Sequence, residues 1–235
     1  MIFRRILCVL VGLLIMNAPA LKAGDSASFV DLGFSQDGSY YMFAQYGVRF
    51  GTLRPWADVF VVDVARNDFV GGGRISHTHD RPILPGQDGS GVLYRLIAHN
   101  AALAGQYGIT YLNQGQPLYI ATEGDPAFTN NPITFRDFSS GISYRADLEE
   151  TIYGSGAGVQ SSFSITVERS GGGITRTYTV GTPIRRPLIT SYRIRRVLID
   201  PSGSSLIFVI EMKRRGEGIS AGGHDTRFMI EALRL

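Results

Sequence analysis

The hydrophobic pattern of the chain predicts buried strands near its two ends. Residues 40–44, 59–62 and 206–210 are continuous runs of apolar side chains. A strand with one face in water alternates apolar and polar positions, whereas a strand that is covered on both faces is apolar throughout. We therefore expect these runs to be central strands that are buried on both sides.

Two similar strand–turn–strand units contain these runs, at residues 29–64 and 194–233. A polar turn that ends in glycine follows Phe34 and recurs 165 residues later after Ile199, and the segments 58–64 and 226–232 match at an offset of 168. Glycine at the end of such a turn adopts a positive φ without a steric penalty. Because a three-stranded sheet is only marginally stable alone, we expect the two units to pack against each other.

Between the two units, helical spacing occurs once. Apolar residues recur every three or four positions over residues 91–107, Ser90 is the expected N-terminal cap, and Gly108 follows the last periodic residue. Residues 68–91 are rich in Gly, Pro, Asp and His, which predicts a long irregular loop.

The remaining periodic segments read as strands separated by Gly, Asn, Pro and Ser clusters. They span residues 117–122, 133–138, 142–153, 161–168, 174–180 and 191–199. The fold class expected from this order is mainly β, an antiparallel β-sandwich or a strongly curved sheet with one α-helix at about residues 91–107.

The first residues have the pattern of a secretory signal peptide. Arg4 and Arg5 precede an apolar run over residues 6–16, and small residues end at Ala23. The run is shorter than the about 20 residues that a membrane-spanning helix needs, so we expect no stable span after cleavage. This predicts a signal peptide at residues 1–23 and one exported β-rich domain at residues 24–235, secreted or periplasmic.

Cleavage changes the composition in two ways. It removes Cys8, the only cysteine, so the mature chain has no disulfide. It also removes three of the 23 basic residues, which leaves 20 to balance the 20 acidic residues. A chain without excess positive charge is not expected to bind nucleic acid.

The balanced charge is unevenly distributed, because basic residues gather in the last third of the chain. They suggest an anion-binding surface, or else they lie beside the acidic first half of the chain and are neutralised by it, which we favour. The candidate anion-binding residues are Arg185, Arg186, Arg193, Arg195 and Arg196.

Candidate metal ligands are His77, His79 and Asp80. Two imidazoles one residue apart on a strand face the same side, and a neighbouring carboxylate adds an oxygen ligand or orients a ring. The set is incomplete for a hydrolytic metal centre, and the glycines and prolines around it are typical of a solvated loop. We therefore expect no cofactor, and a metal-dependent hydrolase is kept as the alternative function.

Two resemblances add to this interpretation. The segment FSQDG at residues 34–38, followed by ADVFVVD at 57–63, resembles one blade of the TolB-type propeller repeat, although Gln36 replaces its proline. Residues 29–47 and 200–233 resemble a bacterial family of predicted secreted proteins of unknown function. That resemblance implies export and brings no activity with it. The sequence thus favours a non-catalytic binding or scaffolding module of the bacterial envelope, whose partner is an envelope protein or a glycan.

Overall fold

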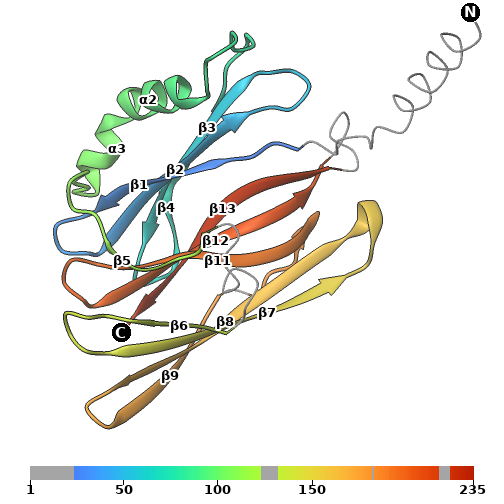
Figure 1. The fold of residues 1–235 in the computed structure, drawn as a ribbon. Helices are drawn as coiled ribbons and strands as arrows, with labels where there is room; N and C mark the ends of the chain where they lie inside the picture. The colour runs from blue at the N-terminus through green and yellow to red at the C-terminus, as the bar shows by residue number, and fades with distance from the viewer. Residues whose placement is uncertain (1–23, 123–131, 182, 217–222) are drawn as a thin grey trace, which may run out of the picture.

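The computed structural model of the protein describes residues 24–122, 132–181, 183–216 and 223–235 (Figure 1). These residues form three antiparallel sheets and two α-helices. The predicted signal peptide at residues 1–23 lies outside the described residues.

The first sheet, which we call the N-terminal sheet, consists of β1 (Ser28–Phe34), β2 (Tyr40–Val48), β3 (Pro55–Asp63) and β4 (Asp68–Thr78) in that order. The central sheet has the order β13 (His224–Arg234), β12 (Ser205–Arg215), β11 (Ile189–Ile199) and β5 (Gln116–Ile120). The outer sheet has the order β10 (Arg186–Pro187), β8 (Gln160–Gly171), β7 (Ser143–Tyr153) and β6 (Ile133–Arg136), with β9 (Ile174–Val180) also on β8.

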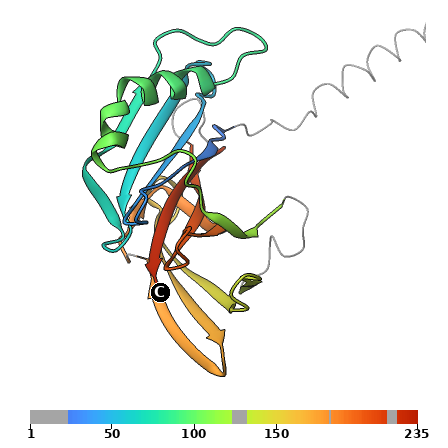
Figure 2. The same cartoon turned by 90° about the vertical axis from the view of Figure 1, so that its left-hand side faces the viewer.

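The helices α2 (Ser90–His99) and α3 (Ala101–Gln106) cover the outside of the N-terminal sheet (Figures 1 and 2). A single 3-10 turn, η2 (Gly156–Gly158), joins β7 to β8. From one side to the other, the layers are helices, N-terminal sheet, central sheet and outer sheet. The expected fold class, a mainly β antiparallel sandwich with helical cover on one face, is confirmed.

The central sheet is covered on both faces, and β12 shows this most clearly. Ile207 and Val209 pack against the N-terminal sheet, whereas Leu206, Phe208 and Ile210 pack against the outer sheet. All five side chains are fully buried. The continuous apolar run of β12 therefore marks a central strand, as predicted.

The two predicted units do pack against each other. A cluster of buried side chains joins Phe34, Phe43 and Phe60 of the first unit to Phe228 and Ile230 of the second. Burial of such large apolar side chains contributes about 1.5–3 kcal/mol each, so this contact is a major source of stability.

The two hairpins have the same turn. Gly38 and Gly203 share a φ of 72°, and each donates its N–H to the carbonyl three residues earlier, that of Ser35 or Asp200. The turns also lie side by side, since a Cβ on Gly38 would come within 2.8 Å of an Asp200 carboxylate oxygen.

The third strands of the two units, however, differ in register. Asp63 lies opposite Tyr40, and its match in the sequence is Glu231, but the residue opposite Ser205 is Arg234. The alignment of residues 58–64 with 226–232 is therefore displaced by three residues. Because an odd shift exchanges the faces of a strand, it turns Phe228 and Ile230 toward the N-terminal sheet.

The expected loop at residues 68–91 is wrong over its first half, which forms β4. The glycines that suggested a loop instead permit an irregular edge strand. Gly72 has a φ of 72°, and a Cβ on Gly73 would lie 2.7 Å from the carbonyl oxygen of Val61 on β3. Close approach of two backbones, rather than chain flexibility, requires glycine here.

The expected single helix is divided into two. The backbone N–H and side-chain Nδ2 of Asn100 both donate to the carbonyl oxygen of Leu96, which ends α2. Ser90 is the first helical residue rather than the cap, and its N–H donates to Asp88 Oδ1. The predicted cap at Ser90 is therefore wrong, and Asp88 instead accepts the first N–H of the helix.

The free edge of β13 is covered by polar groups of the N-terminal sheet and of the segment before it. The N–H of Thr226 donates to the carbonyl oxygen of Asp25, that of Phe228 to Gln45 Oε1, and that of Ala232 to Asn67 Oδ1. An unpaired edge would offer these donors to another chain. The same groups hold the central sheet to the N-terminal sheet.

We predict that Phe228→Ala lowers the free energy of unfolding by about 3–5 kcal/mol, because it removes an aromatic ring from the cluster between the two units. The matched control is Phe138→Ala, whose ring is 86% exposed, and we expect a change of at most about 0.5 kcal/mol. Urea unfolding of both variants measures the difference. Equal effects of the two substitutions would refute the shared core.

Candidate functional site

A surface depression lies where the N-terminal sheet meets the helices. It has a volume of about 850 Å³, within the usual range for small-molecule sites. The wall is formed by the start of β3, the loop between β4 and α2, and the first turns of α2. The lining residues are Pro55, His79, Arg81, Pro82, Ile83, Gly86, Gln87, Asp88, Gly91, Val92 and Arg95. We call it the basic pocket.

Backbone contacts hold the loop that shapes this pocket. The N–H of His79 donates to the carbonyl oxygen of Pro55 at 2.9 Å, and that of Ile83 to the carbonyl oxygen of Leu53 at 2.8 Å. At the far end of the loop, Gly89 is pressed against β2, since a Cβ there would lie 2.5 Å from the carbonyl oxygen of Gly47. The wall is therefore fastened to the sheet at both ends.

Positive charge predominates in the basic pocket. Arg81 and Arg95 are exposed at its rim, and His79 Nδ1 accepts the N–H of Arg81 at 3.1 Å. The one carboxylate, Asp88, accepts both the N–H and the hydroxyl of Ser90, and these hydrogen bonds lower its pKa. Asp88 is thus an ionised group that is already engaged at the helix end, while the two guanidinium groups face solvent.

Only one of the three candidate metal ligands lines the pocket. His79 lines it just beyond β4, whereas His77 is exposed on β4 opposite Ala57, and Asp80 is exposed in the following loop. In residues 24–122, 132–181, 183–216 and 223–235, no three His, Cys, Asp or Glu side chains are grouped as a metal site. The geometry therefore gives no support to the alternative of a metal-dependent hydrolase.

The five candidate arginines of the last third do not share one surface. Arg186 lies over the ring of Phe163 between the central and outer sheets, whereas Arg196 lies over Phe29 on the opposite face of the central sheet. Arg186 also pairs with buried Glu231 at 3.6 Å, and Arg196 faces the half-buried carboxylate of Asp31.

The other three arginines have different neighbours. Arg185 stacks on Tyr153 at 4.0 Å, Arg193 lies opposite Glu211 in the β11–β12 pair, and Arg195 follows Ile194 at a bulge of β11. One acidic residue of the first half, Asp31, thus lies close to Arg196, whereas Glu231 and Glu211 belong to the same last third of the chain as the arginines. An anion-binding role for these arginines stays a prediction.

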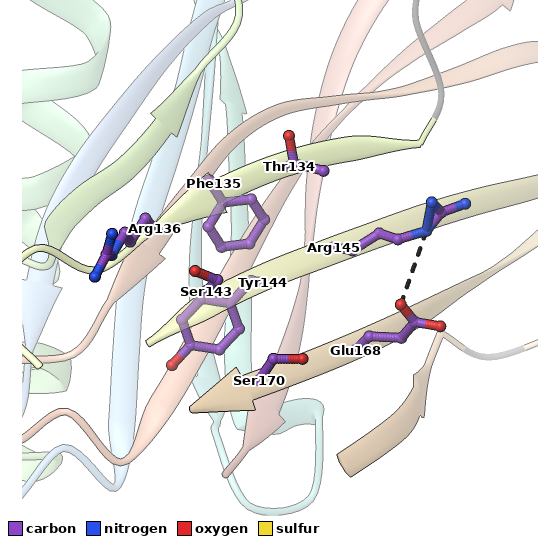
Figure 3. A pocket seen from close by; sticks show the side chains of 8 residues that line it. All are labelled: Thr134, Phe135, Arg136, Ser143, Tyr144, Arg145, Glu168 and Ser170. Atoms are coloured by element: carbon purple, nitrogen blue, oxygen red, sulfur yellow. Dashed lines mark ion pairs between the residues drawn. The ribbon is translucent and has the colours of Figure 1, made fainter. Parts of the chain in front are cut away.

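A second depression, of about 460 Å³, lies on the outer sheet (Figure 3). Its lining includes the exposed cations Arg136 and Arg145, but Arg145 is 3.9 Å from Glu168 and 3.7 Å from Asp147. Because these two carboxylates already pair with Arg145, this depression offers less uncompensated positive charge than the basic pocket. We therefore prefer the basic pocket as the candidate site.

A buried ionic network connects the β2–β3 hairpin with the start of β13. Arg227 Nη2 donates to Asp25 Oδ2 at 2.8 Å, and its guanidinium stacks on Trp56 at 4.2 Å. Asp225 accepts the N–H of Asp25, and Asp25 in turn accepts the N–H of Phe50. Because these groups are engaged with one another, the network fastens the β2–β3 hairpin to β13 and is not a ligand site.

Sequence reasoning missed Arg81, Asp88 and Arg95 as members of a site. Arg81 stands two residues after His79, so its proximity was visible, but Arg95 is one of several exposed residues on an amphipathic helix. Nothing in the spacing connects that helix face with the start of β3. Only the packing of α2 on the N-terminal sheet brings these segments together.

The fold and this site describe an antiparallel β-sandwich protein with a basic pocket on its surface. The chain belongs to the family described as "Predicted secreted protein (DUF2259)", which it matches over residues 42–234. It is accordingly a secreted or periplasmic protein of a family without an assigned activity, as the resemblance of residues 29–47 and 200–233 implied. No curated protein and no solved structure matches the chain. Neither described helix has the length and apolar content that a membrane span requires.

We predict that Arg227→Met lowers the free energy of unfolding by about 3–5 kcal/mol, because it removes the buried cation that pairs with the carboxylates of Asp25 and Asp225 and leaves Asp25 only the more exposed Arg49, at 3.8 Å. The control is Arg145→Met, which breaks a solvent-exposed pair with Glu168 and should cost about 0–1 kcal/mol. Thermal unfolding of both variants at neutral pH compares them. A smaller loss for Arg227→Met than for the control would contradict a structural role for the network.

Proposed function

We propose that the protein is an exported, non-catalytic binding protein that holds a small anionic group, a phosphate or a carboxylate, in the basic pocket. The observation that carries this proposal is the convergence of Arg81, Arg95 and His79 on one cavity whose single carboxylate, Asp88, is already engaged. A surplus of unpaired donors around a cavity of ligand size favours an anion as its occupant.

The chemistry of the arginines supports this choice. A guanidinium group presents a planar fork of N–H donors that matches two oxygens of a phosphate or a carboxylate. Arg81 lies on the loop and Arg95 on α2, so they approach the cavity from two different walls. An anion between them would bridge the loop and the helix.

Binding is a better explanation for this pocket than hydrolysis. Its lining contains no Ser, Thr, Cys or Lys side chain that could act as a nucleophile. The carboxylate of Asp88 has a lowered pKa, which makes it a poor general base near neutral pH. His79 is a lining side chain of a type suited to proton transfer, but the lining places no Ser, Thr, Cys or Lys nucleophile beside it.

We predict that inorganic phosphate and glycerol phosphate bind the mature protein, and that the double variant Arg81→Ala/Arg95→Ala weakens this binding at least about 100-fold, or about tenfold for each charged hydrogen-bonding partner. Isothermal titration measures the dissociation constants. The control is Arg66→Ala/Arg176→Ala, which removes the same charge from two exposed arginines outside the pocket and should leave binding nearly unchanged.

The proposal fails if the two double variants weaken binding equally, because the effect would then reflect net charge alone. It also fails if the wild-type protein binds neither phosphate nor glycerol phosphate. Chemical-shift changes confined to residues around Gly91 and Val92 would locate the bound anion directly.

A further inference from the structure

Three large apolar side chains stand in solvent around the basic pocket. Phe50, Leu53 and Leu84 are 41%, 54% and 67% exposed. Phe50 and Leu53 lie on the β2–β3 hairpin, and Leu84 lies on the loop between β4 and α2; we call these three residues the apolar rim. Both loops are at the top end of the molecule in the two views (Figures 1 and 2). A single exposed leucine is ordinary, but three large apolar side chains on adjacent loops suggest a contact surface.

The fold holds the apolar rim outward rather than letting it collapse onto the core. The N–H of Leu84 donates to Gln87 Oε1, and its carbonyl accepts the N–H of Gln87, which closes a tight turn around it. Leu53 has a φ of 52°, a left-handed conformation that leucine rarely adopts. The N–H of Phe50 is held by the buried carboxylate of Asp25. The backbone at each exposed apolar residue is therefore held in a defined conformation, by hydrogen bonds at Phe50 and Leu84 and in a left-handed conformation at Leu53.

Basic side chains surround the apolar rim. The same two loops and the adjoining turn of α2 carry four arginines and two exposed carboxylates. One arginine, Arg49, pairs with the buried carboxylate of Asp25 at 3.8 Å, and one of the exposed carboxylates is engaged with Ser90. The positive charge therefore exceeds the negative charge at this end of the molecule. The arginines are Arg49, Arg54, Arg81 and Arg95, and the acids are Asp80 and Asp88.

We propose that this end of the molecule docks on a membrane surface that contains anionic phospholipids. The apolar rim enters the boundary between headgroups and acyl chains, and the arginines meet lipid phosphates at the level above it. The inference rests on the proposed function in one respect: the anion in the basic pocket is then the phosphate of a lipid headgroup.

A lipid surface explains this arrangement better than a protein partner does. The core of a protein interface is depleted in charge and packs as a continuous patch. Here single apolar side chains project from two separate loops, and the two on the β2–β3 hairpin are each flanked by an arginine, Phe50 by Arg49 and Leu53 by Arg54. Long basic side chains beside short apolar tips suit an interface that changes from charged to apolar within a few ångströms.

The experiment measures sedimentation of the mature protein with vesicles. Vesicles of phosphatidylglycerol and phosphatidylcholine in equal parts are compared with vesicles of phosphatidylcholine alone. We expect the protein to sediment with the anionic vesicles only, and high salt to release it, because salt screens the arginine–phosphate attraction. Replacing one surface arginine by alanine, as in Arg54→Ala, should weaken partitioning about fivefold.

The rim variant is Leu53→Asn/Leu84→Ser. Asparagine tolerates the positive φ at position 53, so this variant keeps the backbone conformation while it removes both leucines. The matched control is Leu112→Ser/Phe138→Ser, which removes two apolar side chains that are 94% and 86% exposed elsewhere. We expect the rim variant to lose most of its vesicle binding and the control to bind like the wild type.

Three outcomes would overturn the inference: no sedimentation of the wild type with anionic vesicles, equal sedimentation with neutral vesicles, or equal binding by the rim variant and the wild type. Self-association that the rim variant abolishes, without any vesicle binding, would assign this surface to a second copy of the chain instead. Titration with free glycerol phosphate separates the two proposals. If glycerol phosphate binds in the pocket while vesicles do not bind, the proposed function stands and the membrane inference falls.

Discussion

The central sheet depends on being covered from both sides, and the rest of the structure follows from that constraint. Its strand β12 has no polar face between Leu206 and Ile210, so it is stable only between two other apolar surfaces. The N-terminal sheet supplies one surface and the outer sheet supplies the other. Each of these sheets then needs a cover or a polar face of its own, which the helices provide for the N-terminal sheet and which exposed polar residues provide for the outer sheet.

The same constraint explains how the two ends of the chain are joined. β13 is an edge strand, and three of its N–H groups, those of Thr226, Phe228 and Ala232, donate to the backbone carbonyl of Asp25 and to the side chains of Gln45 and Asn67. Polar side chains at an edge both protect it from pairing with other molecules and fix the angle between two sheets. The ionic network around Arg227 adds further contacts at the start of β13, where Thr226 meets Asp25.

This attachment also shapes the end of the molecule that carries the basic pocket. The carboxylate of Asp25 accepts the N–H of Phe50 and so holds the β2–β3 hairpin. The hairpin in turn holds the loop between β4 and α2, because the N–H of Ile83 donates to the carbonyl oxygen of Leu53. A loop that is fastened at several points can keep charged and apolar side chains in solvent in a defined arrangement. Such preorganised loops on a rigid scaffold are where binding sites commonly lie.

Much of the architecture was determined by the sequence itself. Continuous apolar runs predicted strands with two covered faces, glycine-ended turns predicted both hairpins, and helical spacing predicted the segment on the outside of the N-terminal sheet. These features are local, because the spacing of apolar side chains and the backbone freedom of glycine act within a few residues. For the same reason, the sequence correctly predicts tight turns at Gly38 and Gly203, each between two strands.

The tertiary structure decided what local patterns could not. It set the register of β13, because the face that Phe228 presents depends on a partner sheet far away in the sequence. It made a strand of the glycine-rich segment at β4, since β3 supplies the hydrogen bonds that propensity did not anticipate. It brought Arg81 and Arg95 to one cavity and separated Arg186 from Arg196 across a sheet. Sites of this kind arise from long-range packing, and a single sequence records the residues but not the distances between them.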